Sequence, residues 1–160
     1  MIDMLKLLLS PPTKEVVVEK PVFVFPPYIS IALAEYGIHE ELNGDNPRIL
    51  TYLQSVMSQS DVKDEISWCA AFVNWVMRES GYPFNNLPLA RSWLSMGKES
   101  KEYKQFSVVI LKRGSISWQG HVGFVIAERG PYIYVLGGNQ SNTVKISEFP
   151  KTDVLSYRIF

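Results

Sequence analysis

Cys69 is the only cysteine in this 160-residue sequence, and it lies where a thiol ionises readily. Ser67 is a good N-cap residue, and apolar residues then recur at helical spacing up to a stop at Gly81 and Pro83. This pattern predicts an amphipathic helix with Cys69 as its second residue. Free N–H groups and the positive dipole end of a helix stabilise a thiolate, which is the nucleophilic form. Cys69 is therefore a candidate catalytic nucleophile, although a lone cysteine is more often a buried structural thiol.

His121 is the candidate general base because it lies at the start of a predicted strand over 120–127. Alternation along this strand puts His121 and Gly123 on one face, where the small residue leaves room for a helix to approach. The opposite face carries Val122 and Phe124 and reads as a core face. An imidazole at this position can accept the proton of a thiol.

The polar run after Gly138 supplies a candidate for the group that orients the histidine. A predicted hairpin turn over 128–131 places His121 opposite Gly138, beside Asn139. The amide oxygen of Asn139 would accept a hydrogen bond from one imidazole nitrogen and leave the other facing the thiol. Gln140 takes this role if the strand register shifts, and Asn139 can equally be a turn residue after the preceding glycines.

The elements that must position these residues follow one order along the chain, with helices first and strands afterwards. This order indicates an α+β fold, with N-terminal helices packed on a mostly antiparallel sheet of about five strands. The predicted helices span 29–36, a segment beginning at Pro47, the Cys69 segment and 89–96. The predicted strands span 106–111, 120–127, 132–136, 143–149 and 154–160.

Half of the ten prolines lie within residues 11–27. Proline at this density opposes helices and central strands. Residues 1–27 are therefore predicted to form an extended arm rich in proline and valine, and residues 28–160 the compact domain. The arm is a candidate docking element for a delivery or structural partner.

Composition argues against several other classes of protein. The 16 basic and 16 acidic residues give a net charge of zero, and no cluster of Lys and Arg indicates a nucleic-acid binder. With one cysteine and two histidines in the chain, we expect no metal and no cofactor. No stretch reaches the ~20 apolar residues of a membrane-spanning helix. Residues 1–10 lack the basic start and cleavage site of a signal peptide, so we expect synthesis in the cytoplasm without one.

Three motifs, in order, resemble the NlpC/P60 and CHAP superfamily of papain-like cysteine peptidases and amidases. They are WCAAFVNWV at 68–76, GHVGFV at 120–125 and VLGGNQS at 135–141. The similarity is greatest to small bacterial and phage cell-wall hydrolases, and it runs from Tyr28 to Arg158.

The resemblance implies a papain-like fold with Cys69 as nucleophile, His121 as general base and Asn139 as the orienting residue, as in CHAP members. It implies hydrolysis of amide bonds in the peptide part of bacterial peptidoglycan, with an endopeptidase favoured. An N-acetylmuramoyl-L-alanine amidase of the same mechanism is the alternative, as is a non-catalytic component of a phage or secretion apparatus. We expect action in the bacterial cell envelope, as an endolysin, an antibacterial toxin or a remodelling enzyme. A toxin would have an immunity protein as a partner.

Four further residues are candidates for binding substrate: Trp68, Trp118, Gln140 and Asp64. Trp68 flanks the nucleophile and is equally compatible with a groove and a core position. Trp118 lies in the loop before the histidine strand and can line a groove. Asp64 can lie at the mouth of the site, although a solvated acid before a helix is the simpler interpretation. Trp75 is predicted to belong to the core.

Overall fold

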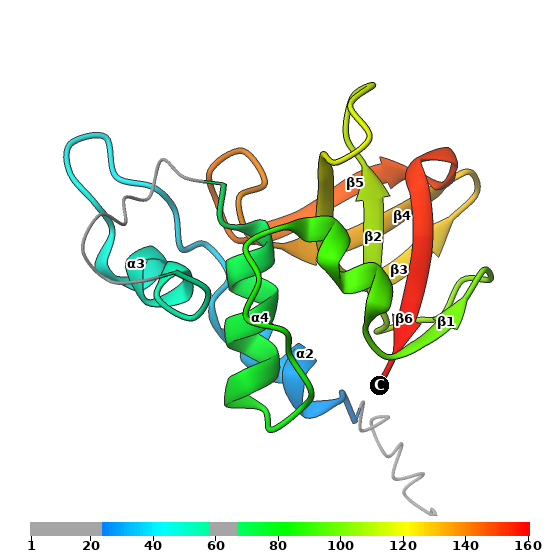
Figure 1. Ribbon diagram of the computed structural model, residues 1–160, viewed down its shortest axis with the longest axis horizontal. Helices are drawn as coiled ribbons and strands as arrows, with labels where there is room; N and C mark the ends of the chain where they lie inside the picture. Colours follow the sequence, from blue (N-terminus) through cyan, green and yellow to red (C-terminus); the bar gives the residue numbers. More distant parts are fainter. Residues whose placement is uncertain (1–23, 58–66) are drawn as a thin grey trace, which may run out of the picture.

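The computed structural model describes residues 24–57 and 67–160, in which helices lie on one side of an antiparallel sheet (Figure 1). The strands follow the spatial order β1-β6-β2-β3-β4-β5. The predicted α+β class, with N-terminal helices on an antiparallel sheet, is confirmed. In chain order the elements are α2 (Pro27–Ala34), α3 (Pro47–Leu53), α4 (Cys69–Glu79), η1 (Ala90–Ser95), β1 (Lys98–Ser100), β2 (Val108–Lys112), β3 (Gly120–Arg129), β4 (Tyr132–Gly137), β5 (Lys145–Pro150), η2 (Lys151–Asp153) and β6 (Val154–Ile159).

The sheet has one strand more than the sequence pattern predicts. The five expected strands correspond to β2–β6, and the additional strand, β1, pairs with β6 at the edge of the sheet. Its three residues are too few to show alternation. The strand expected from residue 106 begins at Val108, because Phe106 has a left-handed backbone (φ 66°) that a strand cannot contain.

The domain boundary at residue 27 stays a prediction, because residues 1–23 lie outside the described part of the chain. In the segments that are described, the helices are all too short or too polar to cross a membrane.

Helix α4 is the central helix and contacts α2, α3 and β3. Nine of its 11 residues are buried, from Cys69 to Met77. Its N-cap residue is Trp68 rather than the predicted Ser67, so Cys69 is the first residue of the helix instead of the second. The predicted core position of Trp75 is confirmed, since this side chain is buried.

Helix α4 packs on the face of the sheet that carries Phe124, so the predicted approach over Gly123 is wrong. Gly123 instead accommodates a neighbouring strand, because a Cβ atom there would lie 2.6 Å from Val135 Cγ1. The close helix–sheet approach is at Gly138, where a Cβ atom would lie 2.5 Å from the ring of Trp68. A side chain at position 138 would therefore push the start of α4 away from the sheet.

An ion pair between the buried Glu35 and the partly exposed Arg48 joins the helices on the other side of α4. The carboxylate of Glu35 accepts hydrogen bonds from Arg48 Nε (2.6 Å) and Nη2 (2.5 Å), and from the hydroxyl of Tyr52. The Arg48 guanidinium also lies 4.5 Å from the ring centre of Trp75 in α4. Burial alone raises the pKa of Glu35, but the hydrogen bonds from Arg48 and Tyr52 outweigh it and hold the pKa below its ordinary value.

Replacing Gly138 by alanine should lower the free energy of unfolding by about 1–3 kcal/mol, because the added methyl group must displace Trp68 in a well-packed contact. Urea unfolding followed by circular dichroism measures this change. Gly130→Asn is the control, since Gly130 has φ 55° and open space around it and asparagine tolerates that backbone. Equal losses in the two variants would contradict the packing role of Gly138.

Glu35→Gln should lower the free energy of unfolding at neutral pH by about 1.5–3 kcal/mol, the range for hydrogen bonds to a charged group. Because the folded pKa of Glu35 is depressed, this stabilisation is complete above the unfolded pKa of about 4.3 and is lost as pH falls through the folded pKa. Urea unfolding at a series of pH values should therefore show the two proteins converging in acid. A difference that does not change with pH would show that the charge of Glu35 contributes nothing.

Candidate active site

The thiol of Cys69, at the start of α4, lies close enough to the ring of His121, near the start of β3, for each group to shift the pKa of the other. Both residues are buried, with exposed fractions of 3% and 8%. The polar groups of Val122 and Ser67 also help to lower the pKa of Cys69. The structure thus brings together the two residues that the sequence proposes as nucleophile and base.

The two groups favour each other's charged forms. Burial alone raises the pKa of Cys69 and lowers that of His121, because desolvation disfavours both charges. Their mutual hydrogen bond and opposite charge outweigh burial, so the pKa of Cys69 is lowered and that of His121 is raised. The hydrogen bond from His121 to Gln140 adds to the rise, and the positive charge of Arg113 opposes it. The arrangement therefore favours a thiolate beside an imidazolium, which is the reactive form of a cysteine nucleophile.

Gln140 is the residue that contacts the far side of the imidazole. Its Oε1 atom lies 2.9 Å from His121 Nε2. Its Nε2 atom donates to the backbone carbonyls of Val135 (3.0 Å) and Lys145 (2.5 Å). Because both amide hydrogens are used on carbonyl groups, the amide oxygen must face the histidine and accept from its Nε2–H. This leaves the other ring nitrogen, Nδ1, for the thiol.

The structure places Gln140 against the imidazole, in the position expected for Asn139. Gln140 is the alternative that a shifted strand register predicts. The predicted hairpin register pairs Phe124 with Val135, whereas Phe124 pairs with Leu136. The difference arises at the turn, because Arg129 pairs with Tyr132 and the hairpin is centred one residue later than predicted. The unpaired Ile126 in β3 then offsets one residue of this shift. Asn139 has the left-handed backbone of a turn residue (φ 55°), and it lines a cavity beside His121 without a hydrogen bond to the ring.

Two further neighbours fix the position of the His121 ring. Phe149 of β5 stacks against it with ring centres 5.3 Å apart and an angle of 23° between the planes. Gly137 lies against the pair of His121 and Gln140, and a Cβ atom there would be 2.9 Å from Gln140 Oε1 and 3.2 Å from His121 Nε2. Any side chain at position 137 would collide with this pair, so the arrangement requires glycine there.

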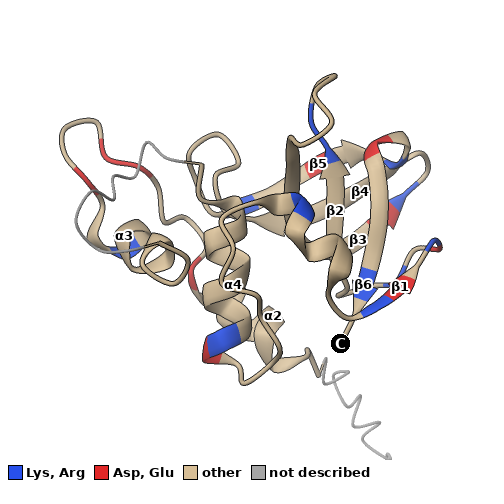
Figure 2. Cartoon of the chain, viewed as in Figure 1, with Lys and Arg blue, Asp and Glu red and all other residues tan. Residues whose placement is uncertain are grey.

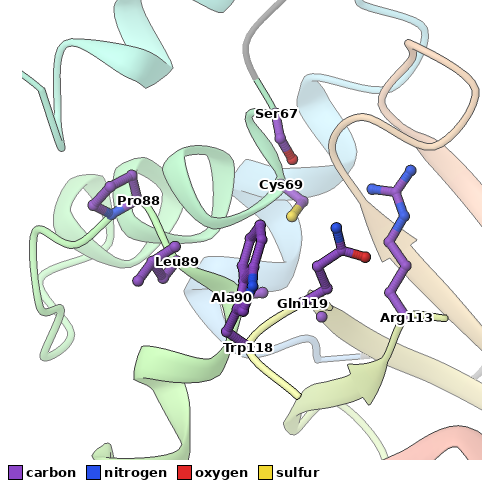
Figure 3. Close-up of a pocket in the computed structure, with 9 residues that line it drawn as sticks. Ser67, Cys69, Pro88, Leu89, Ala90, Arg113, Trp118 and Gln119 are labelled. Atoms are coloured by element: carbon purple, nitrogen blue, oxygen red, sulfur yellow. The ribbon is translucent and has the colours of Figure 1, made fainter. Parts of the chain in front are cut away.

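Two cavities open on either side of this pair and form a candidate substrate groove. The first, here called the thiol cavity, holds about 380 Å³ (Figure 3). Its lining includes Cys69, Leu89, Ala90, Arg113, Trp118 and Gln119. The second, called the imidazole cavity, holds about 430 Å³. Its lining includes Lys112, Arg113, His121, Asn139, Glu148 and Asp153.

The remaining substrate-binding candidates divide between the groove, the core and the undescribed segment. Trp118 lines the thiol cavity and is 63% exposed, so it lies where a groove residue is expected. Trp68 is fully buried and donates its indole N–H to Glu40 (2.9 Å), so its groove role is wrong and it belongs to the core. Asp64 lies outside the described residues, and its role stays a prediction.

Sequence reasoning misses Arg113 and Gln119. Figure 3 shows both side chains on the same side of the Cys69 sulfur, with the indole of Trp118 on another side. The signal lies in the pairing of β2 with β3, where Leu111 is opposite His121. That register carries the residues just after β2 toward the histidine, but it cannot be read from either strand alone.

Residues outside the groove hold its walls in place. The Arg91 Nε–H donates to the backbone carbonyl of Gln119 (2.6 Å), which anchors the loop before β3. The fully buried Asn74 accepts from the backbone N–H groups of Asn85 and Asn86 and donates to the carbonyl of Leu87 (3.2 Å). The chain that leads to the apolar wall of the thiol cavity is thereby tied to α4.

The described segments contain no group of three or more His, Cys, Asp or Glu side chains that could hold a metal ion.

Comparisons with known proteins identify a domain family for the middle of the chain. The sequence model of the CHAP domain matches residues 61–139, a range that includes Cys69 and His121 and ends one residue before Gln140. No curated protein matches the chain.

Two solved structures have a similar fold. One is a lipoprotein-like protein of the NLP/P60 family from Staphylococcus aureus, at 15% identity and a TM-score of 0.47, with 84% of this chain covered. This chain spans only 41% of that protein. The other is the P60 domain of an antigen of M. avium subspecies paratuberculosis, at 10% identity and a TM-score of 0.51, with 82% of this chain and 89% of that domain covered. The likeness to this second structure shows the α+β papain-like fold that the sequence motifs imply.

Iodoacetamide should alkylate Cys69 rapidly at about pH 6, where an ordinary thiol with a pKa of about 8.5 is almost fully protonated. Gln140→Ala should slow this reaction by about 10- to 100-fold, because the imidazolium loses a charge-assisted hydrogen bond and stabilises the thiolate less. Mass spectrometry of the intact protein over time gives the rates.

Asn139→Ala is the matched control, one residue away, and it should react at the wild-type rate. A slow Asn139→Ala variant beside a fast Gln140→Ala variant would make Asn139 the orienting residue after all.

Proposed function

Because this chain belongs to the NlpC/P60–CHAP superfamily, we propose that it is a cysteine hydrolase that cleaves amide bonds in the peptide part of bacterial peptidoglycan. The observation that carries the proposal is the buried pair of Cys69 and His121, which favour each other's charged forms, with Gln140 hydrogen-bonded to the far side of the imidazole. A nucleophile, a base and an orienting group in this order are the components of a covalent hydrolase.

In the first half of the reaction, the Cys69 thiolate attacks the carbonyl carbon of the scissile amide. The tetrahedral intermediate collapses as the C–N bond breaks, and the His121 imidazolium gives its proton to the leaving amine. The product of this half is a thioester between Cys69 and the acyl part of the substrate, together with the free amine.

In the second half, neutral His121 takes a proton from water, and the hydroxide attacks the thioester carbonyl. The C–S bond breaks, the acid leaves, and the thiolate and imidazolium are restored. Gln140 acts on both halves, since its oxygen holds the Nε2–H and keeps Nδ1 directed at the sulfur and the substrate.

The oxyanion that forms in each half requires hydrogen-bond donors near Cys69. We infer that the backbone N–H of Cys69 is one of them, because the first N–H groups of a helix have no partner within the helix. The side-chain amide of Gln119 is the second, since it lines the thiol cavity beside the sulfur (Figure 3). Arg91 supports it by holding the carbonyl of the same residue.

We favour cleavage within the stem peptide, by an endopeptidase, over cleavage of the bond between N-acetylmuramic acid and L-alanine. Both reactions are amide hydrolyses that the same residues can perform, so the choice rests on the tendency of the superfamily. The amidase is the second candidate, and the exposed Trp118 at the thiol cavity is the feature that favours it, because an indole face can stack on a sugar ring.

We also propose that the protein acts in the bacterial cell envelope, where its substrate lies, as an endolysin, a toxin or a remodelling enzyme. A delivery partner or, for a toxin, an immunity protein could bind through the arm at residues 1–27. Residues 24–27 are the part of this arm that the structure describes. In this part, Phe25 packs against Phe106 of the domain, with ring centres 5.5 Å apart.

The wild-type protein should release soluble fragments from purified peptidoglycan sacculi, and Cys69→Ala should reduce the rate by at least about 10³-fold because the nucleophile is lost. Mass spectrometry of the fragments gives the new termini. Free amino groups within the stem peptide identify an endopeptidase, and stem peptides separated from the sugar identify an amidase.

Circular dichroism of Cys69→Ala serves as the folding control. Absence of fragments with the wild type, across sacculi of several cross-link chemistries, would overturn the hydrolase and favour a non-catalytic component of a phage or secretion apparatus.

A further inference from the structure

Arg113 lies where the two halves of the candidate groove meet. It follows the end of β2 directly, and it lines both the thiol cavity and the imidazole cavity. Figure 2 shows basic residues where the chain leaves β2 for the loop to β3. A peptide that passes the Cys69–His121 pair from one cavity to the other must pass this side chain.

Among the residues that the structure describes, no neighbour neutralises the charge of Arg113. Within residues 24–57 and 67–160 it forms no ion pair and no hydrogen bond. The other charged groups of the imidazole cavity do have partners. Lys112 pairs with Asp153 (Nζ–Oδ1 3.3 Å), and Glu148 accepts a hydrogen bond from the hydroxyl of Tyr134 (2.9 Å). Of the described residues that line the groove, Arg113 is thus the cation that is available to a ligand.

We propose that Arg113 binds a free carboxylate of the substrate next to the scissile amide and makes the enzyme specific for acidic peptides. This assignment rests on the proposed hydrolase function. A guanidinium offers two parallel N–H donors that match the two oxygens of a carboxylate, and an exposed side chain can adjust to reach them. A stem peptide supplies such a group wherever an acidic residue is linked through its side chain and keeps its α-carboxylate.

The position of Arg113 also couples binding to the reactive pair. Its positive charge is close enough to His121 to lower the pKa of the imidazole. A bound carboxylate would cancel this charge and so favour the imidazolium that the reaction needs. A neutral peptide would leave the repulsion between Arg113 and the imidazolium in place, and it would also lack the ion pair with Arg113.

The test uses two synthetic stem peptides that span the bond identified by the sacculus digestion. They are identical except that the carboxylate beside this bond is a carboxamide in the second peptide. For the wild type, kcat/KM should fall by about 10- to 100-fold from the carboxylate to the carboxamide, the range for one charge-assisted hydrogen-bonded pair.

Arg113→Gln should lower kcat/KM for the carboxylate by a similar factor and remove the preference between the two peptides. Arg113→Lys, which keeps the charge but not the fork of donors, should restore part of it. Lys151→Gln is the matched control, because it removes a cation that pairs with Glu128 outside the groove, and it should keep the wild-type preference.

An Arg113→Gln variant that still prefers the carboxylate, or a wild type with no preference, would overturn the assignment while leaving the hydrolase intact. If the wild type releases no fragments from sacculi and cleaves neither peptide, the hydrolase function fails and the role of Arg113 fails with it.

Discussion

The interaction between the Cys69 thiol and the His121 imidazole is the constraint that the fold around the candidate site must satisfy. Each group is buried, and burial disfavours the charged form of each, so neither would be ionised without the other. Their mutual attraction reverses both pKa shifts only while the sulfur and the ring stay within hydrogen-bond distance. The fold must therefore fix the start of α4 against the start of β3, although these elements are separated in sequence by the whole middle of the chain.

Packing on both sides of α4 meets this requirement. On the sheet side, Gly138 lets the ring of Trp68, the residue before the nucleophile, lie directly on the backbone after β4. On the helix side, the ion pair of Glu35 and Arg48 closes over Trp75 and joins α2 and α3 to the same helix. A shift of the helix would have to break an apolar contact and a network of charged hydrogen bonds together, which explains how a short helix can place one sulfur atom accurately.

Cys69 and His121 could be predicted because local patterns mark both positions. Cys69 begins a run with the 3.6-residue apolar period of a helix, and His121 begins a run with the two-residue alternation of a strand. The orienting residue was ambiguous for a physical reason. The hairpin turn is centred one residue later than the pattern suggests, with Arg129 paired with Tyr132, and the unpaired Ile126 in β3 offsets part of that shift. No local pattern marks either feature. Trp68 was ambiguous because an indole beside a nucleophile fits a groove and a core equally well. Arg113 could not be found at all without the pairing of β2 and β3.

The choice of Gln140 over Asn139 follows from reach and from the backbone together. Gln140 spans from the turn to His121 while its amide nitrogen bonds to Val135 and Lys145, so one side chain connects β3, β4 and the chain entering β5. An asparagine side chain is shorter by one C–C bond of about 1.5 Å, and it could not keep all three contacts from the same position. Asn139 instead takes the left-handed backbone that the turn requires, which asparagine tolerates better than glutamine. The amide that orients the histidine is thus held by the sheet itself, and the imidazole cannot turn without disturbing the hydrogen bonds of two strands.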